Sequence, residues 1–99
     1  MKITIQITEL DGNFCEGFLS EKYRRELENK ISENVTAEFG DASVSVDVEL
    51  VRNCSGVRPE PNVNTTPDDG AVYRRVMEII EFTRETFGAE CMQDADFYE

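Results

Sequence analysis

The segment KITIQIT, residues 2–8, decides the fold, because its isoleucines and polar residues alternate without a break. Ile3, Ile5 and Ile7 share one face of an extended chain, and the residues between them lie on the other. A period of two on β-branched residues predicts a strand with one buried and one solvent face. The segment SVSVDVEL, residues 43–50, repeats the pattern with valines on the buried face. We therefore expect a sheet that is covered on one side only.

Between these strands lies the pattern of an amphipathic helix. Apolar side chains recur every four residues, at Tyr23, Leu27, Ile31, Val35 and Phe39. The spacing predicts a helix of about five turns that begins after Ser20 as its N-cap. Gly40 is expected to end it in the left-handed conformation, with Asp41 turning the chain.

A second helix is predicted in residues 68–99. Thr66-Pro67-Asp68-Asp69 supplies a Thr or Asp cap and acidic residues near the positive end of the helix dipole. The predicted buried face consists of Val72, Val76, Ile79, Ile80, Thr83 and Phe87. The predicted solvent face consists of Arg74, Arg75, Glu78, Glu81, Arg84 and Glu85. Gly88 interrupts the pattern, so the helix is expected to end or bend there.

The order β-α-β-(β)-α predicts an α+β fold, a small two-layer sandwich with two helices on one face of a two- or three-stranded sheet. The crossover helix between the first two strands suggests that these run parallel. Residues 52–67 contain every Pro of the chain and are expected to form a loop. Val57 or Val63 could start a short edge strand within it, where Pro is tolerated.

Length and composition favour one soluble domain over residues 1–99. The 11.3 kDa chain is long enough for one core and too short for two. No apolar run approaches the roughly 20 residues of a membrane span. The N-terminus MKITIQITEL also lacks the unbroken apolar core of a signal peptide, which favours a cytoplasmic location.

The residues needed for catalysis are scarce. The chain has no His, the commonest general base and metal ligand. Glu81 and Glu85 lie one turn apart but are expected to be exposed, where nothing would tune one as an acid and the other as a base. Cys15, Cys54 and Cys91 are widely spaced and form no C-x-x-C pair. We expect a protein that is not an enzyme and that needs no cofactor or metal.

Negative charge is concentrated at the C-terminal end. Residues 1–67 hold 12 acidic and 7 basic residues, whereas residues 68–99 hold 9 acidic and 3 basic ones. Acids near the C-terminus of a helix oppose its dipole by roughly 0.3–1 kcal/mol each when exposed. Stability alone would favour Lys or Arg there, so folding does not explain the pattern.

Two interpretations of these acids stay open. They can form a solvated tail that promotes solubility. Alternatively, carboxylates one turn apart resemble the phosphates of an extended nucleic acid strand and can occupy a basic groove. The net charge of −11 disfavours direct binding to nucleic acid or membranes and favours a basic partner. Phe97, in the apolar pair Phe97-Tyr98, could act as an anchor within that surface or fold back on the core.

Three segments resemble the DinI-like proteins of the bacterial SOS response. They are MKITIQIT at 1–8, ENKISENVTAEFGDASVSVDV at 28–48 and DDGAVYRRVMEIIEFTRETF at 68–87. Phe39-Gly40-Asp41 and Val44-Ser45-Val46 match the central turn and strand of the family. Arg75, Ile79 and the row Glu78, Glu81 and Glu85 match its final helix.

The resemblance implies a β-α-β-β-α domain that binds RecA, with an acidic C-terminal helix that mimics DNA. Such binding would modulate the RecA filament and its stimulation of LexA-type repressor self-cleavage. The implied contacts are Glu78, Glu81, Glu85, Glu90, Asp94 and Asp96. We expect a monomeric regulator. The alternatives are a phage-type nucleic-acid mimic that inhibits a host defence nuclease, by anti-CRISPR or anti-restriction action, and a small structural or assembly protein.

Overall fold

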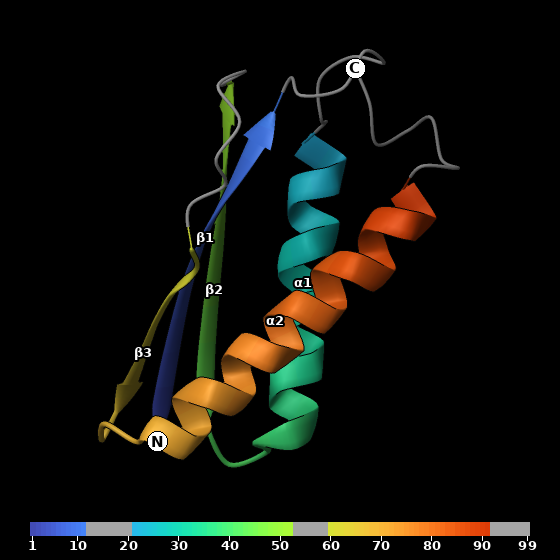
Figure 1. The fold of residues 1–99 in the computed structure, drawn as a ribbon. Helices are drawn as coiled ribbons and strands as arrows, with labels where there is room; N and C mark the ends of the chain where they lie inside the picture. Colours follow the sequence, from blue (N-terminus) through green and yellow to red (C-terminus); the bar gives the residue numbers. More distant parts are fainter. Residues whose placement is uncertain (12–20, 53–59, 92–99) are drawn as a thin grey trace.

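A computed structural model describes the backbone and side chains of residues 1–9, 21–51 and 60–87, and the backbone alone of residues 10–11, 52 and 88–91. The elements are β1 (Lys2–Asp11), α1 (Glu21–Glu38), β2 (Ser43–Arg52), β3 (Asn62–Thr66) and α2 (Gly70–Cys91). Figure 1 shows both helices on the same side of the three-stranded sheet. The predicted α+β, two-layer fold is confirmed.

The sheet has the strand order β2-β1-β3, so the N-terminal strand lies at its centre. β1 runs parallel to β2, as predicted, with Ile3 opposite Val44. β3 runs antiparallel to β1, with Val63 opposite Ile5. The predicted loop at 52–67 is therefore only partly right: Val63 does seed an edge strand, and Val57 lies outside the described residues.

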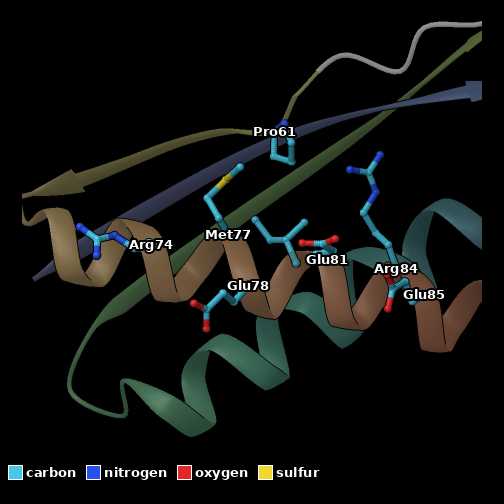
Figure 2. A pocket seen from close by; sticks show the side chains of 8 residues that line it. Pro61, Arg74, Met77, Glu78, Glu81, Arg84 and Glu85 are labelled. Carbon is cyan, nitrogen blue, oxygen red and sulfur yellow. The ribbon is translucent and has the colours of Figure 1, made fainter.

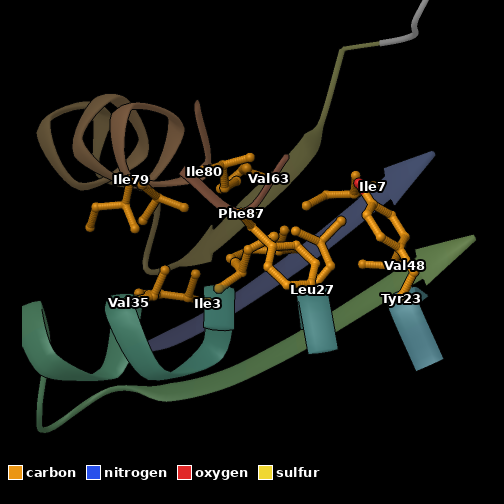
Figure 3. Close-up of a cluster of buried hydrophobic side chains, with 13 residues drawn as sticks. Ile3, Ile7, Tyr23, Leu27, Val35, Val48, Val63, Ile79, Ile80 and Phe87 are labelled. Carbon is orange, nitrogen blue, oxygen red and sulfur yellow. The ribbon is translucent and has the colours of Figure 1, made fainter. Parts of the chain in front are cut away.

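The apolar core lies between the sheet and the two helices (Figure 3). Ile3, Ile5 and Ile7 point into it from the central strand and are almost completely buried. The rings of Tyr23 on α1 and Phe87 on α2 stack with their centroids 5.3 Å apart. Further buried side chains come from every element: Leu27, Ile31, Val35, Val48, Val63, Val76, Ile79 and Ile80. The helical faces predicted from periodicity are thus confirmed, with Val72 and Phe39 only partly buried.

The turn after α1 corrects one expectation. The helix ends at Glu38, and Gly40 does not adopt the left-handed conformation. Instead the amide of Ala42 donates to the carbonyl of Phe39 at 2.8 Å and closes a tight turn. A Cβ at residue 40 would lie 3.8 Å from the nearest atom, so neither space nor backbone angle requires glycine there.

The second helix does not end at Gly88, which was one of the two predicted outcomes, because it continues to Cys91. A single glycine costs a helix only about 1 kcal/mol relative to alanine, which the packing of the preceding turns can offset. The predicted N-terminal cap is Asp69: its carboxylate accepts from the amides of Ala71 at 3.0 Å and Val72 at 3.2 Å. Ser20, the predicted cap of α1, lies outside the described residues.

Polar contacts tie the layers together. Asn34 of α1 donates to the Thr83 hydroxyl on α2 at 2.9 Å, and that hydroxyl donates to the carbonyl of Ile79 at 2.7 Å. On the outer edge of the sheet, the amide of Val48 donates to the Glu28 carboxylate at 2.9 Å. That bond satisfies a backbone donor of an edge strand, which would otherwise be open to pairing with another chain.

Candidate partner-binding surface

The start of α2 is fixed to the sheet. The Asp69 amide donates to the hydroxyl of Thr65 on β3 at 3.0 Å, while its carbonyl accepts from the amide of Tyr73 at 2.9 Å. With its first turn capped and attached, the helix crosses the sheet and packs on α1 as well (Figure 1). The solvent-facing side of α2 is therefore presented on a rigid support.

Three carboxylates follow one another along that side, and we call Glu78, Glu81 and Glu85 the acidic row. Their spacing of three and four residues places them on one helix face, with neighbouring Cβ atoms about 5–6 Å apart. All three are exposed, as predicted, because the core-facing residues of α2 occupy the opposite side. The structure therefore brings together the first three predicted site residues.

The N-terminal end of the acidic row is partly neutralised. The Arg75 guanidinium donates to Glu38 of α1 at 2.8 Å and to Glu78 at 3.2 Å. These two hydrogen bonds raise the pKa of Arg75. Glu78 nevertheless keeps a side chain that is 62% exposed, and an ion pair of this kind contributes little in water.

Arg84 corrects the sequence analysis, which placed it on the solvent face. Its side chain is only 11% exposed and turns inward to Glu9 of β1, which is 2% exposed. The guanidinium Nε donates to Glu9 Oε1 at 2.7 Å, and Nη2 lies 2.6 Å from the same oxygen. The Nη2 contact has poor hydrogen-bond geometry, so we treat it as ionic rather than as a second hydrogen bond. The two side chains form a buried ion pair between β1 and α2.

The inward turn of Arg84 determines the charge of the surface. An arginine three residues after Glu81 is normally placed to pair with it along the helix. Because Arg84 is held by Glu9 instead, neither Glu81 nor Glu85 has an ion-pair partner among the residues that the structure describes. Within the described part of the chain, the C-terminal half of the acidic row thus faces solvent without a counter-charge.

Glu9 is the important residue that the sequence analysis missed. It occupies the next inward-facing position of β1 after Ile3, Ile5 and Ile7, and the observed strand continues to Asp11. The strand predicted from the alternation ended at residue 8 and did not include Glu9. The alternation itself was the available signal, since a carboxylate at the fourth inward position needs a buried cation.

A groove of about 520 Å³ runs beside the acidic row, between α2 and the start of β3 (Figure 2). We call it the α2–β3 groove. Its apolar part is formed by Pro61, Met77 and Ile80. Its charged lining comes from Arg74, Glu78, Glu81, Arg84 and Glu85, so the acidic row forms one of its walls. This groove was not predicted from the sequence.

On the other flank of α2, Phe82 is 65% exposed. It borders a smaller cavity of about 230 Å³ between the helices, whose lining includes Lys30, Glu33 and Thr86. The sequence analysis assigned the role of apolar anchor to Phe97, which lies outside the described residues. Phe82 is an exposed aromatic residue close to the acidic row that it did not consider.

The remaining predicted site residues cannot be placed on this surface. The backbone of Glu90 lies in the last turn of α2, but its side chain is not described. Asp94 and Asp96 lie outside the described residues, as do Cys15 and Cys54, and the Cys91 side chain is not described. Among the side chains of residues 1–9, 21–51 and 60–87, no group of three or more acidic or Cys residues could hold a metal ion.

No helix in the described part of the chain is long and apolar enough to cross a membrane. No protein-family model matches the chain, and no curated protein matches it either.

Proposed function

We propose that this protein is a non-enzymatic, acidic regulator that binds RecA filaments through α2, with the carboxylates of the acidic row standing in for DNA phosphates. The observation that carries the proposal is the pair Glu81 and Glu85, exposed without a counter-charge because Arg84 is held inside by Glu9. The choice of RecA rests on the resemblance of segments 1–8, 28–48 and 68–87 to the DinI-like family.

The physical argument concerns what such a row can attract. A helix that carries unpaired carboxylates along one face creates a negative potential that steers basic grooves toward it. With a net charge of −11, the rest of the chain reinforces that field rather than cancelling it. Continuation of α2 beyond Gly88 adds support, since the family is expected to use an uninterrupted acidic helix.

The test is co-sedimentation with RecA filaments assembled on single-stranded DNA with a non-hydrolysable ATP analogue. Reversal of both charges, Glu81→Lys with Glu85→Lys, should weaken binding at least tenfold, and binding of the wild type should fall as salt rises from 50 to 300 mM. The matched control is Asp47→Lys with Glu49→Lys, which changes the net charge equally on exposed positions of β2.

The two double variants must be compared at the same salt concentration and shown to be folded by circular dichroism. Equal binding by the two would refute the proposed surface. Absence of wild-type binding to RecA would refute the proposed partner. In that case, capture of a nuclease complex by the same surface would favour the alternative of a nucleic-acid mimic aimed at a host defence nuclease.

A further inference from the structure

We infer that the α2–β3 groove is a socket for a lysine or arginine side chain of the basic partner. This inference rests on the proposed function, because it takes the partner to be a basic protein. It goes beyond the proposed function because it names the place where a partner side chain inserts, which is the groove beside the acidic row.

The groove combines an apolar surface with carboxylates. Pro61, Met77 and Ile80 provide an apolar surface, while Glu81 and Glu85 lie along the wall. Lysine and arginine place their methylene stems on apolar surface and keep the charged group in contact with water or a carboxylate. A long cationic side chain satisfies both surfaces at once, whereas a short or neutral side chain satisfies only one.

The charge of the lining changes along the groove. Arg74 lies seven residues before Glu81, about 10 Å along the helix axis at 1.5 Å per residue. Arg84, although it also lines the groove, is engaged with Glu9 and almost completely buried. The groove is therefore basic at the end near Arg74 and acidic at the end near Glu81 and Glu85. A cationic group is expected at the acidic end, away from Arg74.

The groove is also large enough to hold a long side chain. About 520 Å³ falls within the range of roughly 300–1,000 Å³ that is typical of ligand pockets. The cavity beside Phe82 is less than half as large. Its lining includes both Lys30 and Glu33, so it has no comparable preference for a cation. Phe82 is accordingly the natural control position, since it is an apolar residue of the same helix on the other flank.

The experiment uses the full chain and a defined probe, the peptide acetyl-(Arg-Lys-Gly)4-amide, followed by NMR. We expect the methyl signal of Met77 and the amide signal of Ile80 to shift on titration. A peptide in which citrulline replaces Arg and norleucine replaces Lys should not produce these shifts, because it keeps the stems and loses the charges.

Two variants separate the apolar from the charged contribution. Met77→Gln should weaken peptide binding at least threefold with an unchanged salt dependence, because the carboxylates remain. Glu81→Gln should weaken binding and flatten the salt dependence. Phe82→Ala should leave the affinity within a factor of two. Loss of binding in Phe82→Ala together with normal binding in Met77→Gln would overturn the inference.

The same variants distinguish this inference from the proposed function. If filament binding is lost in the Glu81→Lys, Glu85→Lys variant but is unaffected by Met77→Gln, the socket is refuted and the RecA surface stands. If the peptide occupies the groove while charge reversal leaves filament binding unchanged, the acidic row is refuted as the RecA-binding surface and the socket stands.

Discussion

The buried ion pair between Glu9 and Arg84 can be tested with three variants: Arg84→Met, Glu9→Leu and the two combined. Each replacement has a similar size and removes the charge. Each single variant removes the contact between Glu9 and Arg84 and leaves the other charge in the interior. The double variant leaves an apolar contact between β1 and α2 in place of the ion pair.

The burial of the pair sets the expected magnitude. A pair on the surface would contribute about 0–1 kcal/mol. With side chains 2% and 11% exposed, this pair belongs to the buried class, in which loss of one partner costs about 3–5 kcal/mol. The double variant is expected to lie within about 1 kcal/mol of the wild type, or to be more stable, because a well-packed apolar pair avoids the desolvation cost. The two substitutions should thus be strongly non-additive.

The free energies of unfolding of the wild type, the two single variants and the double variant can be measured by urea unfolding followed by circular dichroism. A loss of 3 kcal/mol moves the midpoint by about 1.5 M if the denaturant slope is near 2 kcal/mol/M. A domain of this size has a total stability of about 5–15 kcal/mol, so each single variant should remain measurable at low temperature. Single variants that each cost less than 1 kcal/mol, or a double variant that costs the sum of the singles, would refute the buried-pair argument.

The same variants can also be tested for binding to RecA filaments. In Glu9→Leu, Arg84 loses the carboxylate that holds it inside and becomes free to pair with Glu81 on the surface. We expect weaker co-sedimentation with RecA filaments for this variant, and recovery in the double variant, where Met replaces the arginine. If the Glu9→Leu variant and the double variant are both fully folded and bind filaments equally, the position of Arg84 does not affect filament binding.

Three further predictions concern stability and titration. Phe87→Ala should cost about 3–5 kcal/mol in urea unfolding because Phe87 is buried, whereas Phe82→Ala, an exposed change on the same helix, should cost less than about 1 kcal/mol; similar costs would contradict the assigned faces. Asp69→Ala should cost about 1 kcal/mol through loss of the N-cap, and no change in the urea midpoint would argue against that cap. The hydrogen bond from Arg24, aided by its charge, lowers the pKa of Glu21, so this contact stabilises the fold above the unfolded pKa and is lost as the pH falls through the lowered value. In Arg24→Gln, an NMR titration should find that pKa nearer its ordinary value, and an unchanged value would exclude Arg24 as the cause.

Much of the fold could be predicted because its signals are local. The alternation in residues 2–8 and 43–50 specified two half-buried strands, and the four-residue repeat from Tyr23 specified α1. β3 was harder, because a five-residue strand with one buried valine, Val63, carries almost no periodic signal. Its pairing with β1 is a non-local choice that no short stretch of sequence reveals.

The predictions made from two glycines, Gly40 and Gly88, differ from the structure. Gly40 suggested a left-handed cap, but the chain closes its turn with a backbone bond from Ala42 to Phe39. Gly88 suggested a break, but α2 continues to Cys91. Glycine permits such conformations without requiring them, so its presence is a weaker signal than the apolar periodicity around it.

The candidate surface was predictable only in part. Exposure of Glu78, Glu81 and Glu85 followed from the helical period, because residues three and four apart share a face. The lack of a counter-charge beside Glu81 among the described residues did not follow from the helical period, because it depends on a contact between Glu9 and Arg84. In the sequence, Arg84 is a neighbour of the acidic row and would be counted as its counter-charge. In the fold, its side chain turns inward and pairs with Glu9.

The orientation of the acidic row is set by directional contacts that lie behind it. Behind the acidic row, polar contacts attach α2 and its N-cap to each neighbouring element: Asp69 to β3, Thr83 to α1 and Arg84 to β1. On the exposed side, Arg75 adds a second contact to α1 through Glu38. Apolar packing tolerates some rotation of a helix about its axis, but hydrogen bonds at three positions along that axis allow much less. A rotation of one residue would turn the row by about 100° and carry the groove with it. Substitutions at Glu9 or Asn34, which lie outside the acidic row, should therefore alter partner affinity more than exposed changes on β2 do.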